Sequence, residues 1–227
     1  MTLVVLTREA GLNGELRSHV PPDMTVREVP MKTTTMTARD EVRRSIAAST
    51  WAGDYQTIVL SSARATPYVD VALDYAISSP VIGAVGVVTK KTLEGLGYVV
   101  ALAPEVPNAR ALGAMVTKGP VLFVGAKDPR PELEESVRAR DFEFFAATCY
   151  ETTPLNLSPA GKATLKEADV VVIGAPSAWH VAKPFVSAST WVVVPGETTA
   201  DEIRHEHERV RVAWGNDLRL FLETQHS

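Results

Sequence analysis

Short runs of apolar residues alternate with amphipathic stretches along nearly the whole 227-residue chain. Most apolar runs are continuous in Val, Ile and Leu, which is typical of parallel strands covered on both faces. We expect strands at residues 2–6, 24–29, 57–60, 80–84, 98–102, 120–124, 142–148, 169–173, 190–194 and 210–213. Helical spacing predicts helices at 9–19, 37–50, 63–76, 89–95, 108–117, 130–139, 158–167, 177–185, 198–208 and 216–223. Strand and helix alternate as in doubly wound parallel-sheet α/β domains.

Several predicted helices begin at residues suited to cap them. Thr37, Asn108 and Ser158 stand just before helical stretches, and their side-chain oxygens can accept hydrogen bonds from the first helical amides. Pro159 suits the first position of its helix, where no N–H is needed.

Two threonine-rich segments, 31–36 and 148–155, interrupt the alternation. Threonine favours extended structure, so we expect both segments to be strands of an antiparallel two-stranded linker. Residues 37–147 would then form one α/β domain inserted into a discontinuous α/β domain made of 1–30 plus 156–227. The alternative is a single larger sheet in which both segments are ordinary loops.

One pattern occurs twice. An apolar strand runs into an elbow of small residues at 61–65, followed by Gly86-Val87-Val88-Thr89; the second copy has its elbow at 174–178, followed by a similar turn at 196–200. Such turns expose backbone N–H groups at helix starts, which bind anions. The repeat therefore indicates a large, multiply anionic ligand held between two lobes, at the carboxyl ends of the strands.

Composition narrows the class of protein. The net charge of −4 argues against a general nucleic-acid binder, which usually has a basic domain. Cys149 is the single cysteine, so no internal disulfide can form, which suits a reducing cytoplasm. The apolar run at residues 2–6 is too short for a signal peptide, and no run approaches the roughly 18 apolar residues of a membrane span. We expect a cytoplasmic protein with neither nucleic acid nor membrane as a partner.

Taken in order, these motifs resemble the uroporphyrinogen-III synthase family over nearly the whole chain. Each motif is weak alone, and the order gives the resemblance its specificity. The matching residues are Thr7-Arg8, the elbow at 61–65, Gly86 with Thr89 and Gly97, the stretch 125–127 with Arg130, Tyr150, the elbow at 175–177 and the turn at 196–200.

The resemblance implies a substrate and a reaction. The substrate would be hydroxymethylbilane, a linear tetrapyrrole whose carboxylates are ionised near neutral pH. The enzyme would release the terminal hydroxyl as water and close the ring with inversion of the last pyrrole, a reaction that needs no metal or organic cofactor. We expect a monomer that makes at most a transient contact with the preceding enzyme of the pathway.

The resemblance also implies roles for particular residues. Tyr150 is the candidate proton donor to the leaving hydroxyl, because a phenol stays protonated at neutral pH. No metal site is expected, since His205 and His207 point in different directions on a helix. The candidate substrate-binding residues are Arg8, Ser62, Ala63, Gly86, Thr89, Lys127, Ala175, Ser177, Gly196, Thr198 and Thr199.

Other interpretations stay open. Tyr150 can simply pack against the linker, Arg8 can pair with a nearby acid, and the threonines can be ordinary helix caps. Glu9 and Ala175 stand where the family usually has proline and serine, which leaves room for a non-catalytic two-lobed protein that binds a tetrapyrrole or another anionic ligand. A hinged sensor or phosphosugar-binding protein is a third hypothesis, which rests on the two lobes alone.

Overall fold

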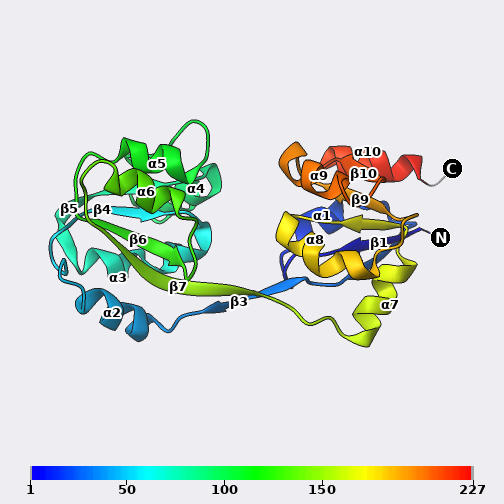
Figure 1. The fold of residues 1–227 in the computed structure, drawn as a ribbon, viewed down its shortest axis with the longest axis horizontal. Helices are drawn as coiled ribbons and strands as arrows, with labels where there is room; N and C mark the ends of the chain where they lie inside the picture. The colour runs from blue at the N-terminus through cyan, green and yellow to red at the C-terminus, as the bar shows by residue number, and fades with distance from the viewer. Residues whose placement is uncertain (1, 226–227) are drawn as a thin grey trace. The chain divides into compact units, whose positions relative to one another are not determined.

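The computed structural model describes residues 2–225, so residues 1, 226 and 227, the ends of the expected discontinuous domain, lie outside the described chain. The chain forms two compact units. Unit 1 comprises Met1–Thr34 and Thr152–Ser227, and unit 2 comprises Thr35–Glu151. Both are α/β units built on a parallel sheet, as the alternation of strands and helices predicts (Figure 1).

Unit 1 contains a five-stranded sheet in the order β10-β9-β8-β1-β2, with every neighbouring pair parallel. Its strands are β1 (Leu3–Leu6), β2 (Thr25–Glu28), β8 (Val170–Val172), β9 (Trp191–Val194) and β10 (Val210–Val212). Its helices are α1 (Gly14–Ser18), α7 (Pro159–Glu167), α8 (Pro176–Ala182), the short 3₁₀ helix η2 (Lys183–Phe185), α9 (Glu197–Arg204) and α10 (Asn216–Thr224).

Helices cover both faces of this sheet, which explains the continuous apolar runs of its strands. Along β1, Val4 packs in the cluster that contains Leu16 of α1 and Phe221 of α10. The next residue, Val5, points the other way and packs in the cluster that contains Trp179 of α8. Each such buried side chain contributes about 1.5–3 kcal/mol relative to exposure, so successive strand residues must all be apolar.

Unit 2 contains a five-stranded sheet in the order β3-β7-β6-β4-β5. Its strands are β3 (Lys32–Met36), β4 (Tyr55–Leu60), β5 (Ala76–Ala84), β6 (Val121–Ala126) and β7 (Phe144–Pro154). Its helices are α2 (Arg39–Ala47), the 3₁₀ helix η1 (Ala63–Tyr68), α3 (Val69–Leu73), α4 (Val87–Gly95), α5 (Ala109–Met115) and α6 (Glu132–Arg138). Strands β7, β6, β4 and β5 run parallel to their neighbours.

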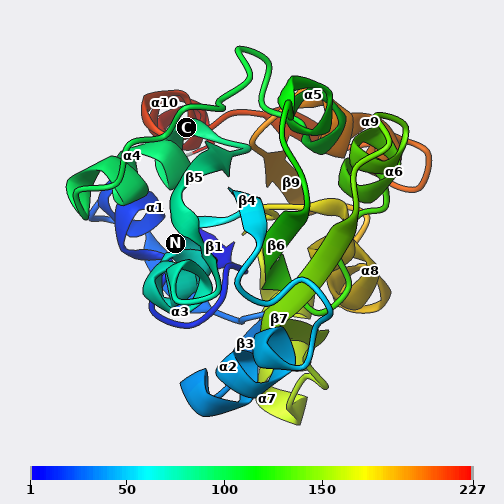
Figure 2. The same ribbon diagram turned by 90° about the vertical axis from the view of Figure 1, so that its left-hand side faces the viewer.

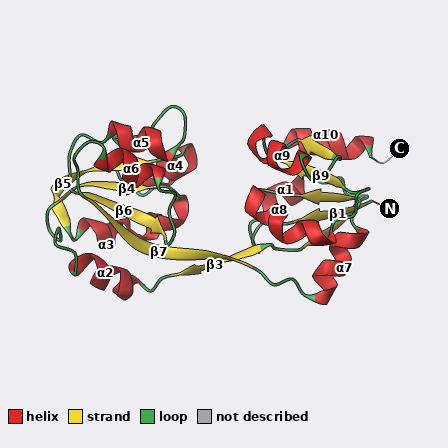
Figure 3. Cartoon of the chain, in the orientation of Figure 1, coloured by secondary structure: helices red, strands yellow, loops and turns green. Residues whose placement is uncertain are grey.

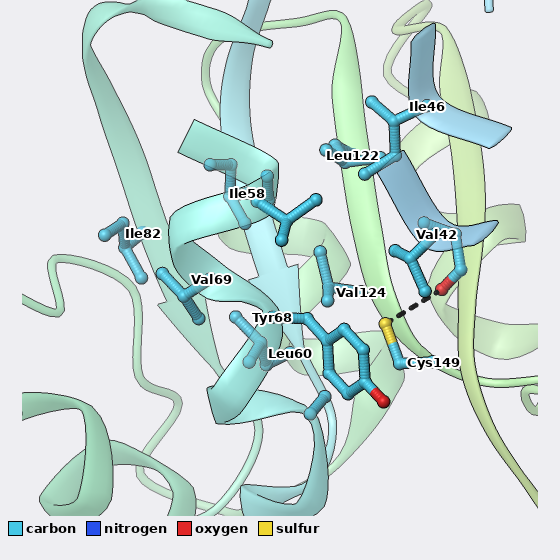
Figure 4. Close-up of a cluster of buried hydrophobic side chains, with 14 of the residues drawn as sticks. Val42, Ile46, Ile58, Leu60, Tyr68, Val69, Ile82, Leu122, Val124 and Cys149 are labelled. Atoms are coloured by element: carbon cyan, nitrogen blue, oxygen red, sulfur yellow. Dashed lines mark hydrogen bonds between the residues drawn. The ribbon is translucent and has the colours of Figure 1, made fainter. Parts of the chain in front are cut away.

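The two faces of the unit 2 sheet carry separate core clusters. Ile58 and Leu60 of β4 face η1, α3 and α2, in the cluster drawn in Figure 4. Val59, between them in sequence, packs with Leu112 of α5 and Leu133 of α6. Figure 2 accordingly shows α3 on one side of β4 and β6, and α5 and α6 on the other.

Strands β3 and β7 connect the two units, because both unit boundaries fall within them (Figure 3). Thr37 N–H donates to the Cys149 carbonyl at 2.9 Å, and Leu155 N–H donates to the Met31 carbonyl at 2.9 Å. From the first pair to the second, the residue number falls on the β3 side, from 37 to 31, and rises on the β7 side, from 149 to 155. The two strands therefore run antiparallel.

Residues 98–102 do not form the expected strand. Only Leu102 makes a bridge, to Gly83. Helix α4 is ended by Gly97 in the left-handed region at φ +90°, and the chain beyond it is irregular, with Val99 81% exposed. Tyr98, Val100 and Leu102 still pack against the cores of unit 2, and the segment touches the edge of β5 only around Leu102, where its pairing with the sheet stops.

The expected helix caps are partly confirmed. Asn108 accepts from Ala111 N–H at 2.7 Å and Ser158 accepts from Gly161 N–H at 3.1 Å. The expectation for Thr37 was wrong, because the N-cap of α2 is Ala38 and lacks a side-chain cap. The Thr37 backbone instead pairs with β7, and its carbonyl accepts the Tyr68 hydroxyl at 2.6 Å.

Two predicted helices are shorter or less regular than expected. The helix expected at 9–19 spans only Gly14–Ser18, since Gly11 upstream adopts φ +81°. The stretch 63–76 begins as the 3₁₀ helix η1, which contains Pro67, and a proline removes the N–H that a regular helical ladder needs.

Candidate active site

Unit 1 has a topological switch point between β1 and β8, where the strand order reverses direction. Ligands of open parallel sheets bind outside the carboxyl ends of the strands at such a point. Thr7 follows β1, and its hydroxyl donates to the Val172 carbonyl of β8 at 2.6 Å. Arg8 comes next, and its Cγ lies 3.7 Å from the place where a Cβ on Gly174 would stand. The first strand therefore delivers Arg8 to the switch point.

The Arg8 guanidinium remains available to a ligand. Its side chain is 34% exposed, and its Nη1 lies 3.8 Å from Glu15 Oε2. An ion pair this long between solvent-accessible groups contributes at most about 1 kcal/mol. The pairing partner is Glu15 rather than the adjacent Glu9, and a ligand carboxylate can compete with it.

Two helices of unit 1 begin at residues singled out by the motifs. Ala175 is the N-cap of α8 and Gly196 is the N-cap of α9, both in extended backbone. Ser177 and Thr198 follow in the first turns and are exposed. Thr199 is only 8% exposed, and its N–H already donates to the Gly196 carbonyl at 3.2 Å. Ser177 and Thr198 can reach a ligand, whereas Thr199 is built into the turn.

Unit 2 has its switch point between β4 and β6. Ser61 and Ser62 follow β4, and Ser62 is the N-cap of η1, with its Oγ accepting from Arg64 N–H at 3.3 Å. Ala63 is the first residue of η1. The elbow therefore presents the start of a helix at the carboxyl end of β4.

Gly86 is the N-cap of α4, which follows β5, and Gly196 is the N-cap of α9, which follows β9. The two glycines therefore lie at equivalent places in the two units. Their φ angles of −129° and −170° are ones that any residue adopts. A Cβ added to either would meet no atom of the described chain within 4 Å. The fold itself therefore does not require glycine at either place. Close approach of a ligand to the backbone is another reason for a glycine, and it would explain both residues. Thr89, in the first turn after Gly86, is only 4% exposed.

Lys127 follows β6, and its side chain is directed to β7. Its Nζ lies 3.0 Å from Glu151 Oε1. The hydrogen bond and charge of Glu151 raise the pKa of Lys127 above its ordinary value. The amide of Lys127 also donates to the Tyr150 carbonyl at 2.8 Å, so the residue fastens the end of β6 to β7.

Tyr150 lies on β7, 6% exposed, in the core cluster that also contains Tyr68 and Cys149. Figure 4 shows the Cys149 thiol in this cluster, donating to the Ala147 carbonyl at 3.6 Å. Burial raises the pKa of Cys149 to about 12. The thiol is therefore protonated at neutral pH and unsuited to act as a nucleophile.

A pocket of about 710 Å³ opens in unit 2 beside its switch point, and sequence reasoning did not anticipate it. It lies next to the elbow and the first Gly-x-x-Thr turn, with Ser61 and Val85 in its wall. Three of its lining residues, Ser61, Ala126 and Arg130, belong to motifs that the sequence analysis identified. The remaining lining comes from 107–110, 128–129, Phe123, Glu132 and Leu133.

Phe123 forms part of this pocket because of a glycine. A Cβ on Gly125 would stand 2.2 Å from Phe123 Cζ, so the ring lies directly against the Gly125 backbone. The packing of the Phe123 ring therefore explains why position 125, in the motif after β6, is a glycine.

Within residues 2–225, no group of three or more His, Cys, Asp or Glu side chains is placed to hold a metal ion. No helix in the same range is long and apolar enough to cross a membrane.

The sequence matches the family model of uroporphyrinogen-III synthase HemD over residues 23–214. The chain belongs to the uroporphyrinogen-III synthase family. The match includes every candidate site residue except Arg8, which precedes it. No curated protein matches the chain.

Solved structures of the family share the fold. A mutant uroporphyrinogen III synthase from Thermus thermophilus aligns with a TM-score of 0.68 at 14% identity, covering 100% of this chain and 98% of that one. The enzyme from Helicobacter pylori aligns with a TM-score of 0.63 at 16% identity, covering 100% of both chains. The wild-type Thermus enzyme in a second crystal form gives 0.53 at 15% identity, over 100% and 98%. These likenesses confirm the α/β architecture of this family member.

Proposed function

We propose that this protein is a uroporphyrinogen-III synthase, which converts hydroxymethylbilane into the cyclic type III tetrapyrrole with loss of water and inversion of the terminal ring. The observation that carries the proposal is the family match over residues 23–214, which includes both glycine-started helices. The protein would act in the biosynthesis of porphyrins and haem.

Substrate binding would rely on backbone amides more than on cations. The substrate's carboxylates are ionised at neutral pH, and the protein carries a net charge of −4. The first amides of a helix have no carbonyl partner in the preceding turn, and a hydrogen bond with a charged partner contributes about 1.5–3 kcal/mol. Donors at the starts of η1 and α4 would hold carboxylates in unit 2, and donors at the starts of α8 and α9 would hold carboxylates in unit 1.

Catalysis would be mainly a matter of position. Loss of the hydroxyl leaves a reactive cationic ring system that closes readily, so the enzyme must direct which carbon attacks. Tyr150 is our candidate for protonating the leaving hydroxyl, a step worth up to about 10²–10⁴-fold in rate. The reaction as written needs neither metal nor organic cofactor.

We further propose that the enzyme works as a cytoplasmic monomer. The single cysteine, which is buried and protonated, suits a reducing compartment. A contact with the enzyme that supplies hydroxymethylbilane would be transient.

The direct test is to add freshly prepared hydroxymethylbilane and to separate the oxidised porphyrin products by isomer. Predominantly type III product is the expected result. Type I product formed at the spontaneous rate, by protein shown to be folded from its circular dichroism, would overturn the proposal.

A further inference from the structure

The segment of unit 1 that carries Arg8 is anchored on both sides of that residue. Before it, the Thr7 hydroxyl donates to the Val172 carbonyl of β8 at 2.6 Å. After it, the Glu9 carboxylate accepts the Thr34 N–H. These contacts hold the two neighbours of Arg8, so the backbone of Arg8 itself must be fixed by another group.

Asn13 supplies that group. It lies in the loop that leads from Arg8 to α1, and it is 1% exposed. Its Nδ2 donates to the Arg8 carbonyl at 3.2 Å and to Glu28 Oε2, at the end of β2, at 3.1 Å. One planar amide therefore joins the backbone of Arg8 to the strand beside β1.

The Asn13 side chain makes these contacts instead of stabilising α1. An asparagine that precedes a helix usually accepts a hydrogen bond from an amide of the first turn. Asn13 is the N-cap residue of α1, but its side chain caps nothing, and its Oδ1 is buried without a hydrogen-bond partner among the described residues. Turning the amide over would place Oδ1 against the Arg8 carbonyl and the Glu28 carboxylate, which are acceptors themselves. A buried acceptor without a partner lowers stability, so stability of the fold does not explain this arrangement.

Arg8 benefits from a fixed backbone because its own side chain is weakly held. The side chain is 34% exposed, and its Nη1 lies 3.8 Å from Glu15 Oε2. A guanidinium presents its N–H donors in a rigid planar fork, so a tilt of the peptide to which it belongs misdirects all of them. An arginine whose backbone is already fixed also loses less conformational freedom when it pairs with a ligand carboxylate.

We infer that Asn13 is a positioning residue that directs Arg8 toward a carboxylate of the substrate. Asn13 acts through the Arg8 carbonyl and, being buried, touches no ligand itself. The inference rests on the proposed function, because it assumes an anionic substrate at the switch point of unit 1. A carboxylate away from the reacting atoms is bound equally well in the ground state and the transition state. Loss of the amide should therefore raise KM and leave kcat unchanged.

Steady-state kinetics of type III product formation test this role in a double-mutant cycle. Arg8→Gln is expected to raise KM about tenfold, equivalent to about 1.4 kcal/mol, and Asn13→Ala about fivefold, both with wild-type kcat. The double variant should have the KM of Arg8→Gln alone, because no guanidinium is left to position. Asn13→Ser should behave as Asn13→Ala does, since its hydroxyl is one bond shorter than the amide donor. Serine is a preferred residue before a helix, so this variant takes the place of Asn13→Ala if the alanine variant does not fold.

Ser158→Ala is the matched control, because it removes the side-chain cap of α7 in the same unit. It should lower stability and keep the KM of wild type, and circular dichroism checks the folding of all variants. An equal rise of KM in Ser158→Ala overturns the inference, because it reports general destabilisation of unit 1.

Three other results also overturn it. One is a wild-type KM in Asn13→Ala and Asn13→Ser, and another is a wild-type KM in Arg8→Gln. The third is a double variant in which the two effects multiply, because Asn13 then acts independently of Arg8. Type III product from wild-type protein leaves the proposed function standing in all these cases. Wild-type protein that yields only type I product at the spontaneous rate refutes both proposals.

Discussion

Replacing Gly86 or Gly196 by alanine separates ligand binding from folding. Both glycines are helix N-caps with ordinary φ angles, and an added Cβ would meet nothing within 4 Å in the described chain. Gly→Ala at such φ angles stabilises a protein by about 0.4–1 kcal/mol through the unfolded chain, but alanine is a poorer N-cap than glycine by a similar amount. We therefore expect each variant to be folded, with a stability close to that of wild type.

Activity, in contrast to stability, should fall. If a substrate carboxylate approaches the backbone beside each glycine, a methyl group there displaces it and weakens one charge-assisted hydrogen bond. Such a bond contributes about 1.5–3 kcal/mol, so kcat/KM should fall by about ten- to one-hundredfold. The assay measures type III product at several hydroxymethylbilane concentrations, together with thermal unfolding of each variant.

Gly95→Ala provides the matched control. Gly95 is the last residue of α4, the helix that Gly86 caps, and its Cβ position is equally open. Alanine in the helix should raise stability by up to about 1 kcal/mol without changing kcat/KM. Wild-type kcat/KM in both Gly86→Ala and Gly196→Ala would refute the idea that a ligand explains these glycines.

Further variants test other parts of the structure. Tyr150→Phe removes one hydroxyl and should fold normally while kcat falls by at most about 10²–10⁴-fold; an unchanged kcat would exclude Tyr150 as the proton donor. Gly125→Ala should lower the free energy of unfolding by about 1–3 kcal/mol, because its Cβ would stand 2.2 Å from Phe123 Cζ; adding Phe123→Leu should recover part of that loss in urea unfolding. Ala175→Ser should raise the free energy of unfolding by about 1 kcal/mol, since it supplies the side-chain cap that α8 lacks; an unchanged midpoint of thermal unfolding would contradict this. Burial holds the pKa of Cys149 at about 12 against 9.0 for an exposed thiol, so its contribution to stability is complete below pH 9 and is lost as pH rises toward 12. Relative to Cys149→Ala, wild type should lose about 1.4 kcal/mol by pH 10, and equal pH profiles of the two proteins in urea unfolding would contradict the shift.

Much of the fold follows from patterns that are local in sequence. The continuous apolar runs of β4, β6, β8 and β9 report burial on both faces of a sheet, and the structure has such a sheet in each unit. Residues 98–102 have the same local composition and form no strand. Whether an apolar run joins a sheet depends on a free edge and a covered face, which are tertiary properties that the run does not encode.

The candidate site likewise has parts that a local sequence pattern predicts and parts that depend on tertiary structure. Motifs identified the helix starts at Ser62, Gly86, Ala175 and Gly196, because caps and small residues carry a local signal. Motif residues lie in the wall of the pocket around Phe123, but no local pattern predicts that a pocket forms there. It depends on a ring lying over a glycine two residues along the same strand, and on loops brought together by chain reversal at the switch point.

The two departures from the family pattern differ in their physical content. Glu9 replaces the usual proline, and its carboxylate accepts hydrogen bonds from the Thr34 N–H and, at 3.0 Å, from the Thr34 hydroxyl. The same hydroxyl lies 3.0 Å from that of Thr152, so Glu9 ties the segment after β1 to both linker strands. Ala175 leaves α8 without a side-chain cap, which costs stability but removes no backbone donor. One departure supplies a structural contact and the other gives up a cap, and neither alters the Ser177 N–H, which follows Pro176 at the start of α8. Neither change therefore removes chemistry that the proposed reaction requires.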